Sequence, residues 1–263
     1  MLYPRIIPCL LIHKKGLVKT TKFTEPKYVG DPINAVKIFN EKKVDELIVL
    51  DIDASIQRRE PDFALIKHLA TECRMPLCYG GGIKTLEQAQ AIFSLGVEKI
   101  AVSSLAVENP SVIPELVKRV GSQSVVVVID AKKRMFSSKY EVYIHNATKS
   151  TGLDAVEFAV KMEQAGIGEI VINSIDNDGV MKGYDFTLLQ KIRDAVKIPV
   201  TVMGGAGTLD DIGKVIAEHG IVGVAAGSLF VFKGKFRAVL INYPTVQEKD
   251  ELVKTYFVDK WSR

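Results

Sequence analysis

The segment Y-G-G-G-I-K-T at positions 79–85 has a counterpart later in the chain, M-G-G-A-G-T at positions 203–208. A shift of 123 residues aligns the glycines of the two segments. The same shift matches Glu46 with Glu169, Ile52-Asp53 with Ile175-Asp176, Asp62-Phe63 with Asp185-Phe186, and Pro76 with Pro199. After one inserted residue, Gly96 matches Gly220 and Ser104 matches Ser228. The matched positions are turns and the ends of apolar runs, so the chain contains two related halves.

Short apolar runs alternate with amphipathic segments in each half, which is typical of repeated βα units around a parallel sheet. We predict strands at 5–12, 46–52, 77–81, 99–103, 125–130, 169–174, 199–203 and 222–226. We predict helices at 32–42, 62–73, 85–95, 110–119, 153–165, 185–195 and 208–218. Eight such strands predict a single-domain (β/α)8 TIM barrel over residues 1–263, built from two (βα)4 half-barrels at about 1–122 and 123–263.

Composition and charge narrow the classes of function. Of the 263 residues, 47% are hydrophobic, which is ample for a large core. The net charge is only +4, and the scattered lysines lack the aromatic partners of a nucleic-acid motif. No apolar run reaches the ~18 residues of a membrane span, and the first residues lack a signal-peptide pattern. Cys9, Cys73 and Cys78 lack metal-type spacing. We therefore expect a cytoplasmic protein that binds no nucleic acid, membrane, metal or cofactor.

Glycines and small residues follow four of the predicted strands. Gly82 and Gly205 stand in the two glycine segments, and Ser103-Ser104 and Gly227-Ser228 end the strands that come next. Glycine lets backbone N–H groups approach an oxyanion closely, and adjacent helix N-termini add a favourable field. The glycines could instead serve only tight turns between strand and helix. Because the pattern occurs twice, we favour phosphate binding and expect a long small-molecule ligand with a phosphate at each end.

Acidic residues follow the same strands: Asp51, Asp53, Asp130, Asp176 and Asp178. A carboxylate that follows a buried strand and faces the mouth of a barrel is a candidate general acid or base. It can equally cap a helix or close a turn. We favour catalysis for Asp130, which comes directly after five apolar residues, whereas a turn-shaping role fits Asp53 and Asp176 as well. His13 and His145 are interpreted as loop residues.

Four predicted strands begin with a charged residue, at Arg5, Glu46, Lys99 and Glu169. Together these side chains could form a neutral ring across the floor of one barrel. The ring could be a plain network of salt bridges, or it could be a gate.

Several motifs identify a family. They are I-P-C-L (7–10), V-K (18–19), G-D-P (30–32), D-E-L-I-V-L-D-I (45–52), G-G-G-I (80–83), A-V-E-N-P (106–110), V-V-V-I-D-A-K (126–132), T-G-L-D-A-V-E (151–157), S-I-D-N-D-G (174–179), G-Y-D (183–185) and G-G-A-G (204–207). With these motifs the chain resembles the cyclase subunit of imidazole glycerol phosphate synthase from Arg5 to about Phe232.

The resemblance implies roles for most of the candidate residues. The turns at Gly82, Ser103-Ser104, Gly205 and Gly227-Ser228 would hold the two phosphates, and Asp178-Gly179 would line the mouth. A separate glutaminase subunit would dock on the floor to form a heterodimer, and its ammonia would travel up through the barrel. The residues Arg5, Glu46, Lys99 and Glu169 would then form the gate, and Glu98, beside Lys99 on the rim, would take part in docking.

The sequence departs from the family at a catalytic position. The family uses two aspartates at the mouth, and the second is Asp130, but Leu11 stands where the first belongs. Loss of a positioned acid–base typically costs about 10²- to 10⁴-fold in rate. His13 points the same way along the strand and could in principle substitute. Ser103 replaces a usual asparagine, and the tail from Ala238 to Arg263 does not follow the family's ending.

Three functional hypotheses follow. We favour a paralogue that keeps the ammonia passage and the docking face but has lost cyclase chemistry, and that passes ammonia to a third enzyme which amidinates sugars for surface polysaccharides. The alternative is an active ammonia-dependent cyclase/lyase of histidine biosynthesis that uses Asp130. A sugar-phosphate isomerase of the half-barrel type fits less well, because it needs a carboxylate after the first strand and no gate.

Overall fold

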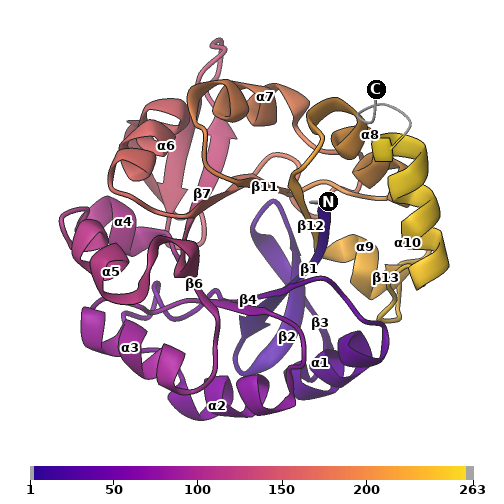
Figure 1. Cartoon of the computed structure of the whole chain (residues 1–263), viewed down its shortest axis with the longest axis horizontal. Coiled ribbons are helices and arrows are strands. Elements are labelled where there is room, and N and C mark those ends of the chain that lie inside the picture. Colours follow the sequence, from indigo (N-terminus) through magenta and orange to yellow (C-terminus); the bar gives the residue numbers. More distant parts are fainter. Residues whose placement is uncertain (1–2, 259–263) are drawn as a thin grey trace.

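The computed structural model describes residues 3–258, which form a closed parallel barrel surrounded by helices (Figure 1). The barrel strands in this range are β1 (Arg5–His13), β4 (Leu47–Asp51), β5 (Leu77–Gly80), β6 (Lys99–Val102), β7 (Val125–Lys133), β10 (Glu169–Ser174), β11 (Val200–Met203) and β12 (Gly223–Ala226). Each strand pairs in parallel with the next, and the pairings β12–β1 and β7–β10 close the ring. The predicted (β/α)8 fold is confirmed, whereas the half-barrel boundary near residue 122 stays a prediction.

The predicted helices are present between the strands. They are α1 (Pro32–Glu41), α2 (Phe63–Glu72), α3 (Leu86–Ser94), α5 (Val112–Val120), α6 (Ala155–Gln164), α7 (Phe186–Ala195) and α8 (Leu209–His219). The repeat reappears in their caps, because the side chains of Asp62 and Asp185 accept the N3 amides of α2 and α7, and Thr85 and Thr208 do so for α3 and α8. No helix within residues 3–258 has the length and apolar character that crossing a membrane requires.

Several short elements were not predicted. They are the one-turn helices α4 (Ser104–Glu108) and α9 (Ser228–Val231), the 3-10 helix η1 (Ser122–Ser124), the strands β13 (Phe232–Lys233) and β14 (Ala238–Val239), the helix α10 (Val246–Val253) and the π-helix η2 (Lys254–Val258). The helices α4 and α9 start at Ser104 and Ser228, which the repeat matches. The repeat therefore extends to these short helices.

Side chains alternate between the inside and the outside of the barrel along each strand. On β1, Ile7 and Cys9 belong to an inner apolar cluster, whereas Ile6 and Leu10 pack outward against the helices. The other members of the inner cluster are Ile48, Cys78, Ala101, Val126, Val128, Val171, Met203 and Ala225, with Leu11 and Leu50 packed on it. The barrel centre is therefore apolar between its floor and its mouth.

Two antiparallel hairpins extend the barrel at its mouth, and neither was predicted. The strands β2 (Gly16–Thr21) and β3 (Thr24–Gly30) follow β1, and the strands β8 (Tyr140–Ile144) and β9 (Lys149–Asp154) follow β7. Each hairpin crosses to the other half of the barrel. The amide of Lys22 donates to the carbonyl of Asp178 at 2.8 Å, and Lys149 lies 3.4 Å from the carboxylate of Glu108.

The C-terminal segment packs on the outside of β1. The buried hydroxyl of Tyr243 donates to the carbonyl of Ile6 at 2.9 Å. Lys249 of α10 pairs with Asp45 at 2.6 Å, and the other oxygen of Asp45 accepts the amide of Ile6 at 2.9 Å. The tail that departs from the family, as far as residue 258, thus covers the first strand; its last residues, 259–263, lie outside the described residues.

Candidate functional site

A cavity of about 730 Å³ opens at the carboxyl ends of the barrel strands. Residues from both halves line it. Among them are all the residues predicted for catalysis and phosphate binding: Leu11, Gly82, Ser103, Ser104, Asp130, Asp178, Gly179, Gly205, Gly227 and Ser228. Positions far apart in the sequence meet here because a closed parallel barrel brings the ends of all its strands to one face.

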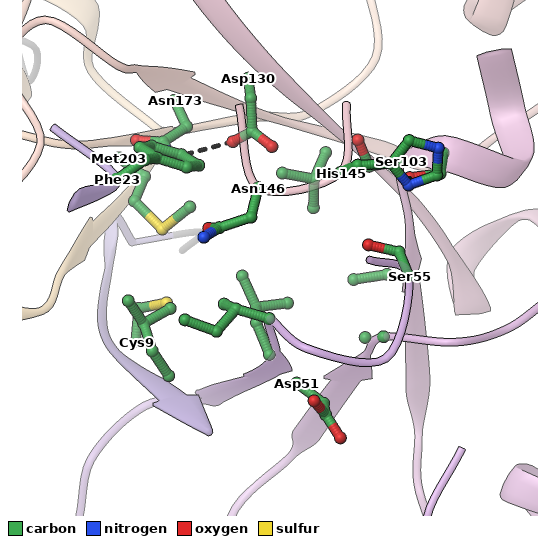
Figure 2. A pocket seen from close by; sticks show the side chains of 18 of the residues that line it. Cys9, Phe23, Asp51, Ser55, Ser103, Asp130, His145, Asn146, Asn173 and Met203 are labelled. Atoms are coloured by element: carbon green, nitrogen blue, oxygen red, sulfur yellow. Dashed lines mark hydrogen bonds between the residues drawn. The ribbon is translucent and has the colours of Figure 1, made fainter. Parts of the chain in front are cut away.

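Asp130 is the half-buried carboxylate on the wall of this cavity, at the end of the apolar run of β7. The side-chain amide of Asn173 on the neighbouring strand β10 donates to its Oδ1 at 2.9 Å (Figure 2). Burial raises the pKa of Asp130 to about 7 and the nearby Asp178 adds to this rise, although the hydrogen bond from Asn173 opposes it. A carboxyl group with a pKa near neutrality can both accept and donate a proton, as a general acid–base must.

Lys19 is a candidate residue that the sequence analysis did not single out. It lies buried on β2, lines the cavity, and its ammonium donates to the carbonyl of Cys9. Burial lowers the pKa of Lys19, against the opposing effects of Cys9 and Asp178. Burial likewise raises the pKa of Asp178, although Lys19 and the hydroxyl of Thr20, 3.1 Å away, oppose this. Two indications were available: the family motif V-K (18–19), and a lysine inside an otherwise apolar and threonine-rich strand, G-L-V-K-T-T.

Asn173 was also missed as a site residue. Its Oδ1 is buried and has no hydrogen-bond partner among the described residues. A buried acceptor of this kind is costly unless a ligand or water satisfies it. Because Asn173 also binds Asp130, it connects that carboxyl group to whatever occupies the cavity.

Leu11 lines the same cavity from β1. It is half-buried, pairs in register with Leu50 of β4, and packs on the inner apolar cluster. The structure does not bring His13 to its aid, because His13 is absent from the cavity lining and its Nδ1 lies 2.7 Å from the carboxylate of Asp53. The structure therefore gives no support to the hypothesis that His13 replaces the missing aspartate.

The remaining acidic residues hold loops in place. The carboxylate of Asp51 makes a two-oxygen ion pair with Arg59 at 2.8 Å. The carboxylate of Asp53 accepts the amide of Lys14 at 2.8 Å, and that of Asp176 accepts the amide of Lys133 at 3.1 Å. These bonds favour the turn-shaping interpretation of Asp53 and Asp176.

The two glycine turns have related backbones. Gly81 and Gly82 have φ of +120° and +76°, and Gly204 and Gly205 have φ of +88° and +119°. A Cβ added at Gly205 would lie 2.1 Å from a carbonyl oxygen, so this turn requires glycine. The amides of Gly82 and Gly205 make no hydrogen bond to any of residues 3–258. Two donors at the mouth are thus available to a ligand.

We call Gly82, Ser103 and Ser104 the first site, and Gly205, Gly227 and Ser228 the second site. Lys19 approaches the second site, since a Cβ added at Gly227 would lie 2.5 Å from its ammonium. A group of three or more His, Cys, Asp or Glu side chains arranged to hold a metal ion is absent from residues 3–258.

The four charged residues form a closed ring at the opposite end of the barrel. Arg5 bonds to Glu46 and lies 2.7 Å from Glu169, and Lys99 lies 2.9 Å from Glu46 and 3.0 Å from Glu169. Both carboxylates are buried, while the side chains of Arg5 and Lys99 are 30% and 19% exposed. Burial alone would lower the pKa of Lys99, but the two carboxylates outweigh it and raise that pKa.

Glu98 lies beside Lys99 and is exposed, as the docking prediction requires. Its carboxylate also accepts the amide of Leu77 at 2.8 Å, which fixes the start of β5. A contribution of Glu98 to docking stays a prediction.

Comparison with known proteins agrees with this arrangement. A model of the family described as "Histidine biosynthesis protein" matches residues 5–237. A protein of Vibrio vulnificus (strain YJ016) named "Putative imidazole glycerol phosphate synthase subunit hisF3" is 58% identical over 254 residues, which cover 97% of this chain and 98% of that protein. A protein of Leptospira borgpetersenii named "Putative imidazole glycerol phosphate synthase subunit HisF" is 59% identical over 252 residues, or 96% and 99% of the two chains.

A third relative is less similar. The "Imidazole glycerol phosphate synthase subunit HisF" of Petrotoga mobilis (strain DSM 10674 / SJ95) is 43% identical over 230 residues, which cover 88% of this chain and 91% of that protein. The family model ends at residue 237, and the tail that departs from the family begins at Ala238. The two more similar relatives align over 96–97% of this chain.

Proposed function

Because the chain belongs to the histidine biosynthesis protein family and is a cyclase-type subunit of the imidazole glycerol phosphate synthase kind, we propose a specific role for it within that family. It accepts ammonia from a partner glutaminase at the barrel floor and conducts it to the mouth. Its own cyclase chemistry is weakened, and the ammonia goes to a third enzyme that amidinates a sugar for surface polysaccharide.

The interior of the barrel supports the passage of ammonia. Above the charged ring, the inner cluster runs through Ile7, Val126 and Val171 to Leu11 and the mouth. Apolar walls of this kind disfavour ammonium and bulk water, because an ion loses its hydration there, but they admit small neutral ammonia. Four ion pairs link the ring residues across the floor, and in the proposed role at least one of them opens for ammonia to pass.

The observation that carries the loss of cyclase chemistry is Leu11. The strands β1 and β7 lie four apart in the eight-stranded ring, so Leu11 and Asp130 face the cavity from opposite sides. Asp130 can transfer one proton, but a second transfer on the far side of the substrate needs another group. A leucine packed on Leu50 supplies none.

The alternative is an active cyclase/lyase of histidine biosynthesis, and one observation favours it. Asp130, Asn173 and Lys19 surround the same cavity as the two glycine turns. A site that had lost all function would be expected to lose such costly buried polar groups. Asp130 would then be the principal catalytic residue.

The substitution Leu11→Asp distinguishes the two roles. We expect little or no ammonia-dependent turnover of the family's bisphosphate substrate by the unmodified protein, and an increase of about tenfold or more in Leu11→Asp. The matched control is Leu11→Asn, which has nearly the same shape and transfers no proton. Because Leu11 packs on the inner cluster, the free energy of unfolding of both variants has to be measured alongside turnover.

Rapid turnover by the unmodified protein that Leu11→Asp leaves unchanged or lowers would assign it to histidine biosynthesis. A second measurement addresses the partner. The barrel should form a one-to-one complex with its glutaminase, and the absence of any such complex would exclude the ammonia role altogether.

A further inference from the structure

We propose that His145 is an additional anion-binding residue of the first site, and that the anion is the dianionic phosphate of a phosphate ester. This inference rests on the proposed function, in which phosphate groups occupy both sites. It adds to that function because it gives the first site a basic side chain that the matching position near the second site lacks. Neither the family match nor the repeat assigns His145 a role.

The turn between β8 and β9 carries His145 into the cavity. The residues His145, Asn146 and Ala147 have φ of +54°, +53° and +59°, an unusual run for residues other than glycine. Thr148 holds this turn, because its amide and its hydroxyl both donate to the carbonyl of His145, at 3.2 Å and 2.7 Å. Figure 2 shows His145 beside Ser103, with Asn146 reaching toward the centre of the cavity. Backbone strain of this kind persists only where the surroundings enforce it.

The imidazole of His145 bridges two groups of α4. Its Nε2 lies 2.9 Å from the carboxylate of Glu108, and its Nδ1 lies 3.4 Å from the hydroxyl of Ser104. The carboxylate accepts a hydrogen bond from Nε2–H in either charge state of the ring, so Nδ1 is the atom that faces the first site. Nδ1 accepts from Ser104 when the ring is neutral, and it becomes a donor when the ring is protonated.

Glu108 positions this imidazole and remains ionised. Burial would raise the pKa of Glu108, but the hydrogen bonds and charges of His145 and Lys149 overcome it and lower that pKa. Lys149 of β9 lies 3.4 Å from the same carboxylate. A protonated His145, held between this carboxylate and the first site, gives a charge-assisted hydrogen bond to an arriving phosphate oxygen.

The second site has a related turn without an imidazole. The repeat shift of 123 residues places Lys22 and Phe23, at the tip of the hairpin β2–β3, on His145 and Asn146, and these also have positive φ, +52° and +64°. Lys22 is exposed, however, and its amide donates to the carbonyl of Asp178. The two halves therefore share a hairpin turn with positive φ, but this turn carries an imidazole at the first site and an exposed lysine at the matching position of the other hairpin.

Other charged groups that face the cavity also affect anion binding, so the experiment needs controls for them. Arg58 and Lys84 are two further basic residues that line the cavity, from the loops after β4 and β5. Asp130, with a pKa of about 7, gains negative charge as pH rises and would by itself weaken anion binding. The experiment must separate the effect of Asp130 from that of His145.

Sulfate is the probe, because it remains a dianion between pH 5.5 and pH 8 while phosphate does not. In calorimetric titration of the whole protein at pH 5.5, the unmodified protein should bind sulfate about tenfold more tightly than His145→Gln, the value of one charge-assisted hydrogen bond. Both proteins keep Asp130, so its effect cancels in this comparison. His145→Lys, which stays charged, should bind sulfate more tightly than His145→Gln at both pH values, and the difference between His145 and His145→Gln should persist when Asp130→Asn is added to both proteins.

Crystals soaked in selenate at each pH assign the effect to one site. Selenium occupancy at the first site should fall in His145→Gln, while occupancy at the second site stays the same. Equal sulfate affinity of His145→Gln and the unmodified protein at pH 5.5 overturns this inference and leaves the proposed function standing. Absence of sulfate and selenate from both sites in every variant overturns the two-phosphate ligand itself.

Discussion

Asp130 combines two properties at the scale of a single residue. It faces the cavity, and the protein around it disfavours its ionised form, so that its pKa rises to about 7. The unfolded chain ionises this carboxyl near its ordinary pKa of 3.8. Between these values the folded protein holds a proton that the unfolded chain has released, and stability falls as pH rises. The site therefore costs the fold stability at neutral pH.

This leads to a prediction for Asp130→Asn. The variant should unfold with a free energy similar to that of the unmodified protein near pH 4, and it should be more stable at pH 8, by on the order of 4 kcal/mol at most. The acceptor of the Asn173 amide is retained in this variant, so the hydrogen bond persists. Denaturant unfolding at pH 4, 6 and 8 measures the trend.

The control for this prediction is Asp194→Asn on the exposed side of α7. It should change the free energy of unfolding by less than about 0.5 kcal/mol at each pH. A stability difference between Asp130→Asn and the unmodified protein that does not grow with pH would contradict the raised pKa.

At the scale of elements, the C-terminal segment is held by a few identifiable bonds. The helix α10 has no fully buried residue, so its own packing contributes little. The strongest anchors are Tyr243, which is buried and stacks at a tilt on Phe230, and the pair of Lys249 with Asp45. Tyr243 and Asp45, the partner of Lys249, both bond the backbone of Ile6. The tail therefore holds the start of β1, where Arg5 extends to the charged ring.

Tyr243→Phe tests this attachment. The variant leaves the carbonyl of Ile6 without its side-chain donor in a buried setting and should lower the free energy of unfolding by about 1–2 kcal/mol. Tyr256→Phe is the matched control, because the hydroxyl of Tyr256 bonds the exposed Asp210. It should cost less than about 0.5 kcal/mol. Urea unfolding of both variants gives the comparison, and equal losses would show that the Tyr243 hydroxyl does not anchor the tail.

The barrel strands and the helices between them could be predicted from the sequence, whereas the hairpin strands and several short elements could not. The barrel strands are continuous apolar runs, and the helices between them carry caps such as Asp62 and Thr208. The hairpin strands are different. The strand β9, K-S-T-G-L-D, contains only one apolar residue and lies on the surface, so burial leaves no periodicity in it. Short elements of this kind depend on the strand beside them.

The residues that line the cavity divide in the same way, between those on barrel strands and those on hairpins. The position of Gly82, Gly205 and Asp130 at the cavity could be predicted, because each follows an apolar run. The repeat and the fold class identify these runs as barrel strands whose ends meet at one face. The places of Lys19 and His145 in the cavity could not be predicted, since both reach it from the hairpins; the motif V-K marked Lys19 only as part of the family pattern. Leu11 was identified only by comparison with a family pattern, as an apolar residue at the end of an apolar strand carries no indication of its own.

At the scale of the whole molecule, the charged ring joins four strands from both halves of the barrel. Arg5 and Lys99 lower the pKa of Glu169 against the opposing effect of burial. The stability that Glu169 contributes is therefore fully present above the ordinary pKa of glutamate, and it is lost as pH falls through the lowered value.

Lys99→Met should break this ring and leave Arg5 as the one ring cation beside both carboxylates. Removing one partner from a buried ion pair costs about 3–5 kcal/mol, so the free energy of unfolding should fall by roughly that amount. Lys214→Met removes an exposed ion pair with Asp210 on α8 and should cost less than about 1 kcal/mol. If the ring is a gate for ammonia, Lys99→Met in the complex with glutaminase should also change the ratio of glutamine consumed to ammonia captured at the mouth. An unchanged ratio with lowered stability would leave the ring a plain salt-bridge network.

The crossing of the two hairpins has a consequence for ancestry. Each hairpin lies against the half of the molecule that did not encode it, as Thr20 does against Asp178 and His145 against Glu108. A gene for one half alone would therefore specify loops at the mouth without the hairpin that lies against them, and a hairpin without the loops that it contacts. Two copies of that product, related by a twofold axis, would complete each other's pocket. Any duplication that fused such copies would have preserved a pocket that already depended on self-association.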